Sequence, residues 1–368
     1  PKIKTKLAFG RKFGMIWRTN MTQSDAFMSD NVTLGEETAV IGPGRGRSLS
    51  TSVDASPHCI AFLLVPGFAL LTYSCAMEPY RAANTLSGKE LYRWMHISPD
   101  GRPVVASNGV SIVPDQGIES QINADDLFVC AGGNPTHFDD RGVLAWLRRQ
   151  SRLSTRIGGV AGGPFILARA GLLKGYRCTM HWEYIPGFRE KFPDHMVTAT
   201  RFEIDRTRCT SAGGTAAFEM MVELIARRNG AELASAVCEW FLHTKLGSSQ
   251  DPQRMALPAR YGVTNSRLLR ALEYIEHSFE DTTCRQTIAS KTGVSVRQLE
   301  RLFQAHLGCT INEHIQRLRL ERARTLLQQT SMSVLDVAVA SGFTSSAHFS
   351  RTYRKRYGHP PRAERKQL

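Results

Sequence analysis

The spacing of apolar residues divides the chain into two regions of different secondary structure. From Cys59 to about His243, short apolar runs typical of buried strands alternate with amphipathic stretches typical of helices. In order, these segments are CIAFLLV, YSCAMEPYRAANTL, DLFVCAGG, VLAWLRRQ, RIGGVAGGPFILARAGLL, RFEIDRTRCTSAGG and TAAFEMMVELIARRNG. The alternation predicts an α/β fold, a mostly parallel sheet with helices on both faces. Residues 267–368 contain no convincing strand and predict short helices throughout.

These patterns predict four segments along the chain. They are a flexible N-terminal extension (1–55), an α/β domain (56–245), a linker containing Pro, Ser and Gly (246–264) and an all-helical domain (265–366). The extension has weak periodicity and an early run of lysines and arginines. A nucleic-acid arm or a targeting peptide is the alternative interpretation of that extension.

The distribution of charge indicates a site for a polyanion near the C-terminus. Lys and Arg outnumber Asp and Glu by 47 to 33 in the 368 residues, a formal net charge of +14. Such a charge favours nucleic acid or an anionic membrane surface as a partner. Residues 263–368 hold 17 basic and 9 acidic side chains, so +8 of the charge lies in less than a third of the chain.

Membrane spans, disulfides and metal sites are not expected. The longest apolar run, residues 59–73, is broken by Pro66 and Gly67 and is shorter than the ~18 residues of a membrane span. We interpret this run as a buried strand and its loop. The eight cysteines include no CxxC pair, and no signal peptide is evident. We therefore expect a cytoplasmic protein without disulfides, metal or cofactor.

Two segments of the helical region resemble one another. They are TIASKTGVSVRQLERLFQAHLG (287–308) and VAVASGFTSSAHFSRTYRKRYG (337–358). Their alanines and glycines match at an offset of 49 before the turn and their later residues at an offset of 50, so the second turn has one additional residue. Each copy has the pattern of a helix-turn-helix, in which Ser295 or Thr344 caps the second helix. A helical hairpin repeat that binds nothing is the alternative.

The segment between the two copies predicts a rigid spacer. INEHIQRLRLERARTLLQQT has apolar residues at helical spacing, among them Ile311, Ile315, Leu318, Ala323 and Leu326. A single helix there holds the two units at a fixed separation. Two recognition helices then reach successive major-groove faces of one duplex, roughly 34 Å apart.

Residues expected to face outward from the predicted recognition helices are the candidate DNA contacts. They are Ser295, Val296, Arg297, Gln298 and Arg301 in the first copy, and Ser345, Ser346, Ala347, His348, Arg351, Arg354 and Lys355 in the second. Arg297 and Gln298 are the best candidates for sequence readout, because Arg and Gln contact guanine and adenine edges through two hydrogen bonds. Arg351, Arg354 and Lys355 are expected to neutralise phosphates. For each residue, a solvated surface charge is the alternative.

Three further segments of the helical region, together with the two copies, resemble a known family over about a hundred residues. RLRLERARTLL, SMSVLDVAVASGF and HFSRTYRKRYGHPPRAER, with the two helix-turn-helix copies, resemble the DNA-binding domain of AraC/XylS-type transcription regulators. The resemblance implies binding to promoter DNA, contact with RNA polymerase, a homodimer and, more often, activation than repression. The string TSSAH departs from the family, so its base contacts do not transfer directly. A nonspecific nucleoid-binding protein is a further alternative.

The glycine-rich stretch GGVAGGP (158–164) follows a predicted strand and begins a predicted helix. With EPYRAANTLSGKELYRW, FVCAGG and TSAGGTAAFEMMVELIA, it resembles PfpI-type domains related to class I glutamine amidotransferases, which implies a flavodoxin-like doubly wound sheet. In enzymes of that family a cysteine occupies the turn beside an acid from the first helix. The corresponding positions are Ala161 and Glu78. A methyl group is no nucleophile, and Cys130 and Cys178 are expected to be buried, so a thiol hydrolase or amidotransferase with a DNA-binding tail is the disfavoured alternative.

What remains of such a domain is a crevice at the carboxyl ends of its strands, where ligands bind in open α/β sheets. The candidate ligand-binding residues are Glu78, Gly132, Gly133, Ala161, Gly162, His181, Trp182 and Glu183. An aromatic face beside a carboxylate favours a cationic effector, unless Trp182 is core packing and Glu183 a surface charge. EPYRAANTLSGKELYRW and GHPPRAER also resemble regulators of glycine betaine, carnitine and arginine catabolism, which implies an effector derived from an amine or amino acid.

Overall fold

The computed structural model describes residues 56–133, 135–153, 156–281 and 284–364. The predicted N-terminal extension, residues 1–55, lies outside the described residues. Among the described residues, no helix is both long enough and apolar enough to cross a bilayer. All eight cysteines lie in described segments, and none forms a disulfide.

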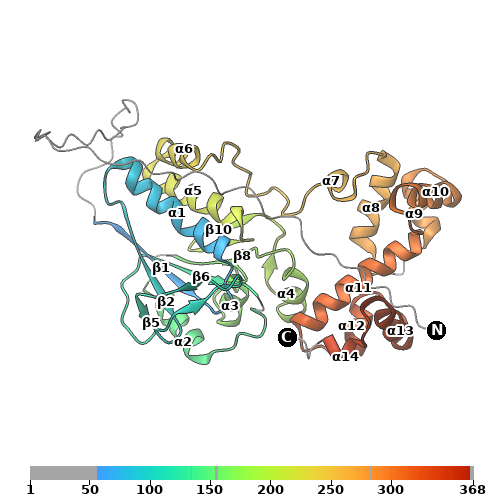
Figure 1. The fold of residues 1–368 in the computed structure, drawn as a ribbon, viewed down its shortest axis with the longest axis horizontal. Coiled ribbons are helices and arrows are strands. Elements are labelled where there is room, and N and C mark those ends of the chain that lie inside the picture. Colours follow the sequence, from blue (N-terminus) through green and yellow to red (C-terminus); the bar gives the residue numbers. More distant parts are fainter. Residues whose placement is uncertain (1–55, 134, 154–155, 282–283, 365–368) are drawn as a thin grey trace, which may run out of the picture. The chain divides into compact units, whose positions relative to one another are not determined.

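A seven-stranded sheet organises residues 58–211 (Figure 1). In spatial order its strands are β10 (Phe202–Asp205), β11 (Arg208–Ser211), β7 (Arg156–Ala161), β6 (Asp126–Ala131), β1 (His58–Leu64), β2 (Tyr92–Ser98) and β5 (Gln116–Gly117). Every neighbouring pair is parallel except β10 and β11. Two small pairs lie outside the sheet, β3 (Val104–Val105) with β4 (Ser111–Ile112), and β8 (Arg177–Cys178) with β9 (Met196–Val197). The predicted doubly wound, flavodoxin-like sheet is confirmed.

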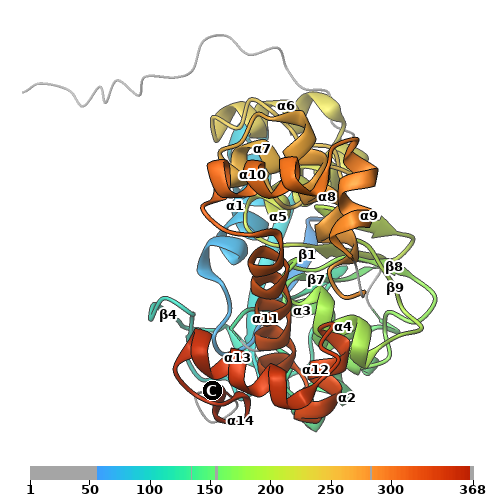
Figure 2. The ribbon, with the colours of Figure 1, turned by 90° about the vertical axis from the view of Figure 1, so that its right-hand side faces the viewer.

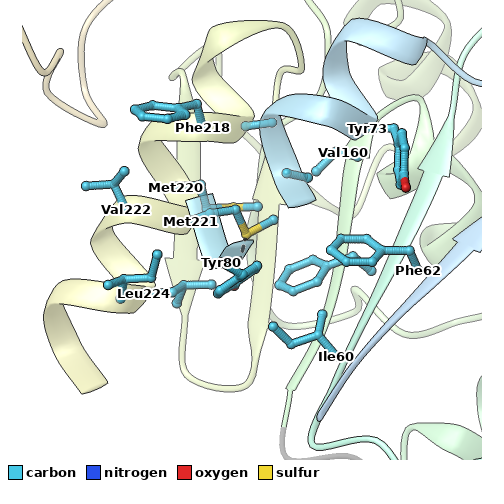
Figure 3. Packing of buried hydrophobic residues seen from close by; sticks show 14 of the residues in the cluster. Ile60, Phe62, Tyr73, Tyr80, Val160, Phe218, Met220, Met221, Val222 and Leu224 are labelled. Atoms are coloured by element: carbon cyan, nitrogen blue, oxygen red, sulfur yellow. Dashed lines mark hydrogen bonds between the residues drawn. The ribbon is translucent and has the colours of Figure 1, made fainter. Parts of the chain in front are cut away.

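Helices cover both faces of this sheet because its central strands are apolar on both sides. On one face lie α1 (Leu70–Ser87), α5 (Thr215–Asn229) and α6 (Ala231–Trp240). Their apolar core includes Tyr80, Met220 and Met221, which pack toward Ile60 and Phe62 of β1 (Figure 3). The core of the other face involves α2 (Arg141–Gln150), α3 (Gly163–Arg169) and α4 (Ile185–Lys191).

The C-terminal region is entirely helical in its described residues, as predicted. Its helices are α7 (Leu257–Tyr261), α8 (Ser266–Ser278), α9 (Arg285–Thr292), α10 (Val296–Leu307), α11 (Ile311–Gln329), α12 (Val334–Ala340), α13 (Ser346–Tyr357) and α14 (Pro361–Glu364). They form two small cores, one around α8, α9 and α10 and the other around α12 and α13.

Helix α11 joins the two cores as one continuous helix (Figure 2). Ile311 and Ile315 in its first half belong to the core of the first unit. Ala323 and Leu326 in its second half belong to the core of the second unit. A capping box between Thr310 and Glu313 fixes its start. The predicted spacer is therefore a helix whose two ends are each anchored by burial.

Candidate DNA-reading surface and ligand-binding turn

The two predicted helix-turn-helix units are α9–α10 and α12–α13, and each second helix has a capped start. Ser295 accepts a hydrogen bond from the backbone N–H of Gln298, 3.2 Å away, at the start of α10. At the start of α13 the cap is Ser345, which accepts from the N–H of His348, and not Thr344 as predicted. The cap follows Gly342 by three positions instead of two after Gly293. The additional residue of the second turn moves the cap onto Ser345.

The second helix of each unit, α10 or α13, buries one face, and the buried and exposed positions correspond between the two helices. Leu299 and Phe303 of α10 are buried, and so are Phe349 and Tyr353, their counterparts 50 residues later in α13. On the opposite side, Arg297, Arg301 and Gln304 of α10 are exposed, as are Ala347, Arg351 and Arg354 of α13. These triplets, at spacings of four and three residues, each form one stripe along a helix. We call them the first and second stripes.

Not all of the predicted DNA-contacting residues are free to contact a partner. Val296, predicted to face outward, is half-buried against the core, because its spacing from Leu299 and Phe303 places it on the apolar face. The side-chain oxygen of Gln298 accepts from the backbone N–H of Ser295 at 3.0 Å, which completes a capping box. Ser346, His348 and Lys355 are exposed.

Gln304 was missed by the sequence reasoning. It lies seven residues after Arg297 and three after Arg301, on the same exposed side of α10. The helical spacing from Arg297 was the available signal. Its counterpart at the offset of 50 is Arg354, a predicted DNA contact of the second copy.

The glycine-rich turn lies at the carboxyl ends of β6 and β7, where Ala131 pairs with Ala161. Ala161 has a left-handed backbone, with φ of 54°. After it, α3 begins so close to β6 that a Cβ added to Gly163 would lie 2.1 Å from the carbonyl oxygen of Val129. The turn thus retains the close strand-to-helix packing of a nucleophile turn, whatever residue stands at its tip.

Several predicted ligand-binding residues come together at this turn. The N–H of His181 donates to the carbonyl oxygen of Ala161 at 3.3 Å. The hydroxyl of Tyr184 donates to the carbonyl oxygen of Gly133 at 3.0 Å. Burial lowers the pKa of His181, and the nearby Glu183 opposes that shift. Gly132, Gly133, Ala161, Gly162 and His181 therefore share one edge of the sheet.

Glu78 is not placed beside the turn. It forms an ion pair with Arg81 at 2.7 Å, and it lies six residues, or about 9 Å of helix, beyond Thr72. Thr72 is an α1 side chain near Ala161, because both Thr72 and Ala161 lie beside Gly213. The hydroxyl of Thr72 accepts from the N–H of Gly214 at 2.8 Å. The available sequence signal was the position of Thr72 in the first turn of a helix that follows a strand. Such a turn lies at the carboxyl edge of the sheet.

Comparison with known proteins resolves the family. The Helix-turn-helix domain model matches residues 288–367, and the DJ-1/PfpI family model matches residues 59–227. The HTH-type transcriptional regulator GbdR of Pseudomonas aeruginosa is 43% identical over 310 residues, which cover 84% of this chain and 84% of the relative. The chain belongs to the AraC-type transcriptional regulators with a DJ-1/PfpI domain.

This AraC-type regulator is also similar to a second sequence relative and to a solved structure. The HTH-type transcriptional regulator CdhR of Pseudomonas aeruginosa is 43% identical over 304 residues, covering 83% of this chain and 90% of the relative. The crystal structure of an AraC family transcriptional regulator from Pseudomonas putida aligns at 28% identity with a TM-score of 0.47, covering 50% of this chain and all of that one. The matched Helix-turn-helix domain and the relatives that align over most of the chain show that the regulator is a DNA-binding protein of transcription.

In this AraC-type regulator, residues 247–254 lie along the α/β domain, and we call them the strap. Gln253 donates from its amide nitrogen to the carbonyl oxygens of Met180 and Thr200, at 2.9 and 2.7 Å. The guanidinium carbon of Arg254 lies 4.8 Å from the ring centroid of Trp182. The strap is thereby attached to the residues next to His181.

The next helix belongs to the DNA-binding domain of the regulator. Tyr261 of α7 donates its hydroxyl to Glu276 of α8 at 2.7 Å, and Arg260 pairs with the same carboxylate. Met255 and Ala256, both exposed, are the residues between the strap and α7. The α/β domain and the DNA-binding domain are therefore joined by a very short free segment.

The part of the regulator that the structure describes contains no set of side chains that could bind a metal ion. Within residues 56–364, less the short gaps, no group of three or more His, Cys, Asp or Glu side chains is placed to hold an ion. Burial raises the pKa of Cys130 well above its usual value and that of Cys178 to about 12. These thiols are protonated at neutral pH and behave as small apolar side chains.

Proposed function

We propose that this regulator reads a promoter with α10 and α13 and changes its DNA binding in response to a small cationic effector bound beside Trp182. The observation that carries the DNA-reading half is the pair of stripes, which recur at an offset of 50 on two capped helices. A helical repeat that bound nothing would have no need to repeat an exposed basic stripe.

The two stripes have different roles in this proposal. Arg297, Arg301 and Gln304 contact base edges, because Arg and Gln side chains form paired hydrogen bonds with guanine and adenine. Arg351, Arg354 and Lys355 contact phosphates, since the second stripe begins with Ala347, which has no polar group to contact a base edge. Ser346 and His348, exposed at the start of α13, lie where polar base contacts are common in helix-turn-helix domains. Ser295, Ser345 and the oxygen of Gln298 act through capping.

Binding to randomised duplexes tests this division. Arg301→Ala is expected to weaken the preferred site by about 1–3 kcal/mol and to relax base preference at one position. Arg354→Ala is expected to weaken binding to all duplexes by the same factor. It should also reduce the dependence of DNA affinity on salt concentration by about one phosphate contact. Arg270→Ala, an exposed arginine of α8 outside both stripes, is the matched control. Equal losses for Arg301→Ala and Arg270→Ala would contradict the proposal.

Trp182 supports the effector half of the proposal. The residue is 42% exposed, and its ring already contacts a cation, the guanidinium of Arg254. The carboxylate of Glu183 lies 3.8 Å from the imidazole of His181 next to it. An effector with a quaternary ammonium or guanidinium group has the same chemistry as Arg254 and competes for the ring.

This competition gives a route from effector to DNA. An effector that takes the ring from Arg254 releases the end of the strap, which continues through Met255 and Ala256 into α7 of the DNA-binding domain. Since the effector binds only the arrangement in which the ring is free, it shifts the population toward that arrangement. The effector class, amine or amino-acid derivatives such as glycine betaine, carnitine or arginine, comes from the resemblance in sequence.

Thermal denaturation with betaines, amino acids and polyamines tests the effector site. A ligand at a hundred times its Kd stabilises the folded state by about 2.7 kcal/mol. Arg254→Ala is expected to tighten effector binding because it removes the competing cation, and Trp182→Leu to abolish binding. Trp240→Leu, which alters another half-exposed tryptophan, is the control. Unchanged affinity in Arg254→Ala would overturn the competition.

We also propose that the regulator is not an enzyme. The tip of its turn is a methyl group, and the α1 side chain beside that turn is Thr72, not a carboxylate. Assays of ester and amide hydrolysis should detect nothing in the purified protein, with Ala161→Cys as the comparison. Hydrolysis by the unaltered chain at an enzymatic rate would contradict this proposal and support the hydrolase alternative.

The remaining parts of the proposal come from the family resemblance. They are a homodimer, contact with RNA polymerase during activation, and a cytoplasmic location beside the chromosome. Sedimentation with and without effector tests the dimer, and transcription from a supercoiled template with purified polymerase tests activation.

A further inference from the structure

A cavity of about 290 Å³ lies at the edge of the sheet opposite the glycine-rich turn. Its lining includes the first residues of four parallel strands, His58, Tyr92, Asp126 and Arg156. Tyr80 and Leu224, which Figure 3 shows on the helical side of the core, complete its wall. Because amino ends of parallel strands share one edge, this cavity is separate from the turn at Ala161.

Asp126 is the buried charge of the cavity. The residue is 1% exposed, and one carboxylate oxygen, Oδ2, accepts from Nε2 of His58 at 2.9 Å and from Arg156 at 2.7 Å. The other oxygen, Oδ1, is buried and has no hydrogen-bond partner among the described residues. A buried carboxylate oxygen without a donor is unfavourable, so this atom marks where a ligand's donor group fits.

The mouth of the cavity is cationic. Arg227 and Arg228, in the last turn of α5, are exposed and line it. Arg227 is paired with Glu223 at 2.8 Å, whereas Arg228 makes no hydrogen bond or ion pair with the described residues. With Arg156 already paired to Asp126, the guanidinium of Arg228 is the uncommitted charge at the entrance. An anionic group is attracted there.

The tyrosine hydroxyl groups that line the cavity already donate hydrogen bonds to other side chains of the protein. Tyr92 donates to the side-chain oxygen of Asn229 at 2.5 Å, and Tyr80 donates to the sulfur of Met221 at 3.2 Å. The polar groups without a partner among the described residues are therefore a buried acceptor, Oδ1 of Asp126, and a donor at the mouth, the guanidinium of Arg228. A ligand that satisfies both has a hydrogen-bond donor and an anionic group.

We propose that this cavity is a second ligand-binding site, for a small carboxylate that carries a hydroxyl or ammonium donor near the carboxylate. The carboxylate binds Arg228 in the two-bond geometry that guanidinium and carboxylate share. The donor group binds Oδ1 of Asp126. Simple carboxylates without a donor leave that oxygen unpaired and bind more weakly. The regulator thereby has a site for an anionic metabolite distinct from the one proposed for its cationic effector.

Calorimetry on the full chain at constant ionic strength tests this site with three four-carbon acids. L-Malate supplies a hydroxyl donor, L-aspartate an ammonium donor, and succinate neither. At least one of the first two is expected to bind about tenfold more tightly than succinate, the factor that one hydrogen bond contributes. Malate and aspartate also distinguish the two donors. Equal binding of all three acids, or no binding at millimolar concentration, would overturn the proposal.

Two variants locate the binding. Arg228→Gln is expected to weaken the preferred acid about tenfold, as the loss of one charged contact does. Arg149→Gln removes an equally exposed arginine from the last turn of α2 and should change nothing. Asp126→Asn should erase the preference over succinate. If that variant fails to fold, Arg228→Gln still decides, because a preferred acid whose affinity it leaves unchanged binds elsewhere.

Discussion

The guanidinium of Arg254 lies over the indole of Trp182, 4.8 Å from the ring centroid. Arg254 is the last residue of the strap, and Trp182 follows His181, whose N–H donates to Ala161 at the tip of the turn. The ligand-binding edge predicted from sequence and the connection to the DNA-binding domain therefore share one aromatic side chain.

Replacing Gln253 should loosen the strap. In Gln253→Leu the carbonyl oxygen of Met180 loses its side-chain donor, whereas that of Thr200 keeps the hydroxyl of Thr179 at 2.7 Å. The unpaired carbonyl costs about 1–3 kcal/mol. We expect faster hydrogen exchange in residues 247–254 and a smaller effector-dependent change in DNA affinity. Gln250→Leu, at an exposed strap position, should leave both unchanged. Exchange rates that do not differ between the two variants would show that Gln253 does not hold the strap.

Arg297 and Gln298 are neighbours with different expected roles. Gln298→Ala removes half of the capping box of α10 and should lower the free energy of unfolding of the DNA-binding domain by about 0.5–1 kcal/mol. Arg297→Ala should leave stability unchanged and alter discrimination among duplexes by about 1–3 kcal/mol. Urea titration and competition binding separate the effects. A reversal of the two results would place Gln298 on the bases.

Gly163 should be irreplaceable at the glycine-rich turn. An added Cβ meets the backbone oxygen of Val129 at 2.1 Å, and neither the strand nor the helix can move without disturbing the sheet. We expect Gly163→Ala to lower the free energy of unfolding by about 3 kcal/mol or more. Gly142→Ala, in the exposed first turn of α2, should change it by less than about 1 kcal/mol. Thermal melts of both variants provide the comparison.

The buried His314 should make the DNA-binding domain sensitive to acid. Burial, and then the adjacent Arg317, lower the pKa of His314 to about 4 from its usual 6.5. The neutral ring accepts from Arg317 at Nδ1, 2.8 Å away, and packs against Tyr261 and Phe303.

Between pH 6.5 and 4 the unfolded chain binds a proton that the folded chain does not. The free energy of unfolding is therefore highest above pH 6.5 and falls by roughly 3 kcal/mol as the pH drops to 4. Urea titrations across this range measure the loss. His314→Gln should flatten the curve, whereas His306→Gln, at an exposed position of α10, should not.

Cys284 should be the most reactive thiol. It is exposed before α9, and the backbone N–H groups of Thr287 and Gln286 lower the pKa of its thiol. Burial raises the pKa of Cys209 to about 12. Reaction with a chromogenic disulfide reagent should show a fast phase of about one equivalent, because the thiolate is the nucleophile. Cys284→Ser should remove that phase. Its persistence would assign the phase to another cysteine.

Much of the fold followed from local patterns in the sequence. Apolar runs and helical spacing predicted the parallel sheet, the helical C-terminal region and the continuous spacer that became α11. The repeat located both second helices and the additional residue in the second turn, because periodicity and capping depend on residues a few positions apart. Resemblance in sequence is sufficient to identify the two domains.

The sites depended on contacts between distant residues. The family resemblance predicts Glu78 as the acid of the turn, but the structure places Thr72 there, because the direction of α1 decides which of its turns reaches the carboxyl edge. The strap contacts of Gln253 and Arg254 join residues more than 50 positions apart, and no local pattern announces them.

The sequence by itself determined which segments are strands and helices and where the exposed basic stripes recur, since these follow from periods of two and 3.6 residues. The tertiary structure decided which polar groups remain unpaired after folding. Gln298 became a cap, and Asp126 retained one oxygen without a donor, because hydrogen-bond partners are fixed only when distant elements pack together.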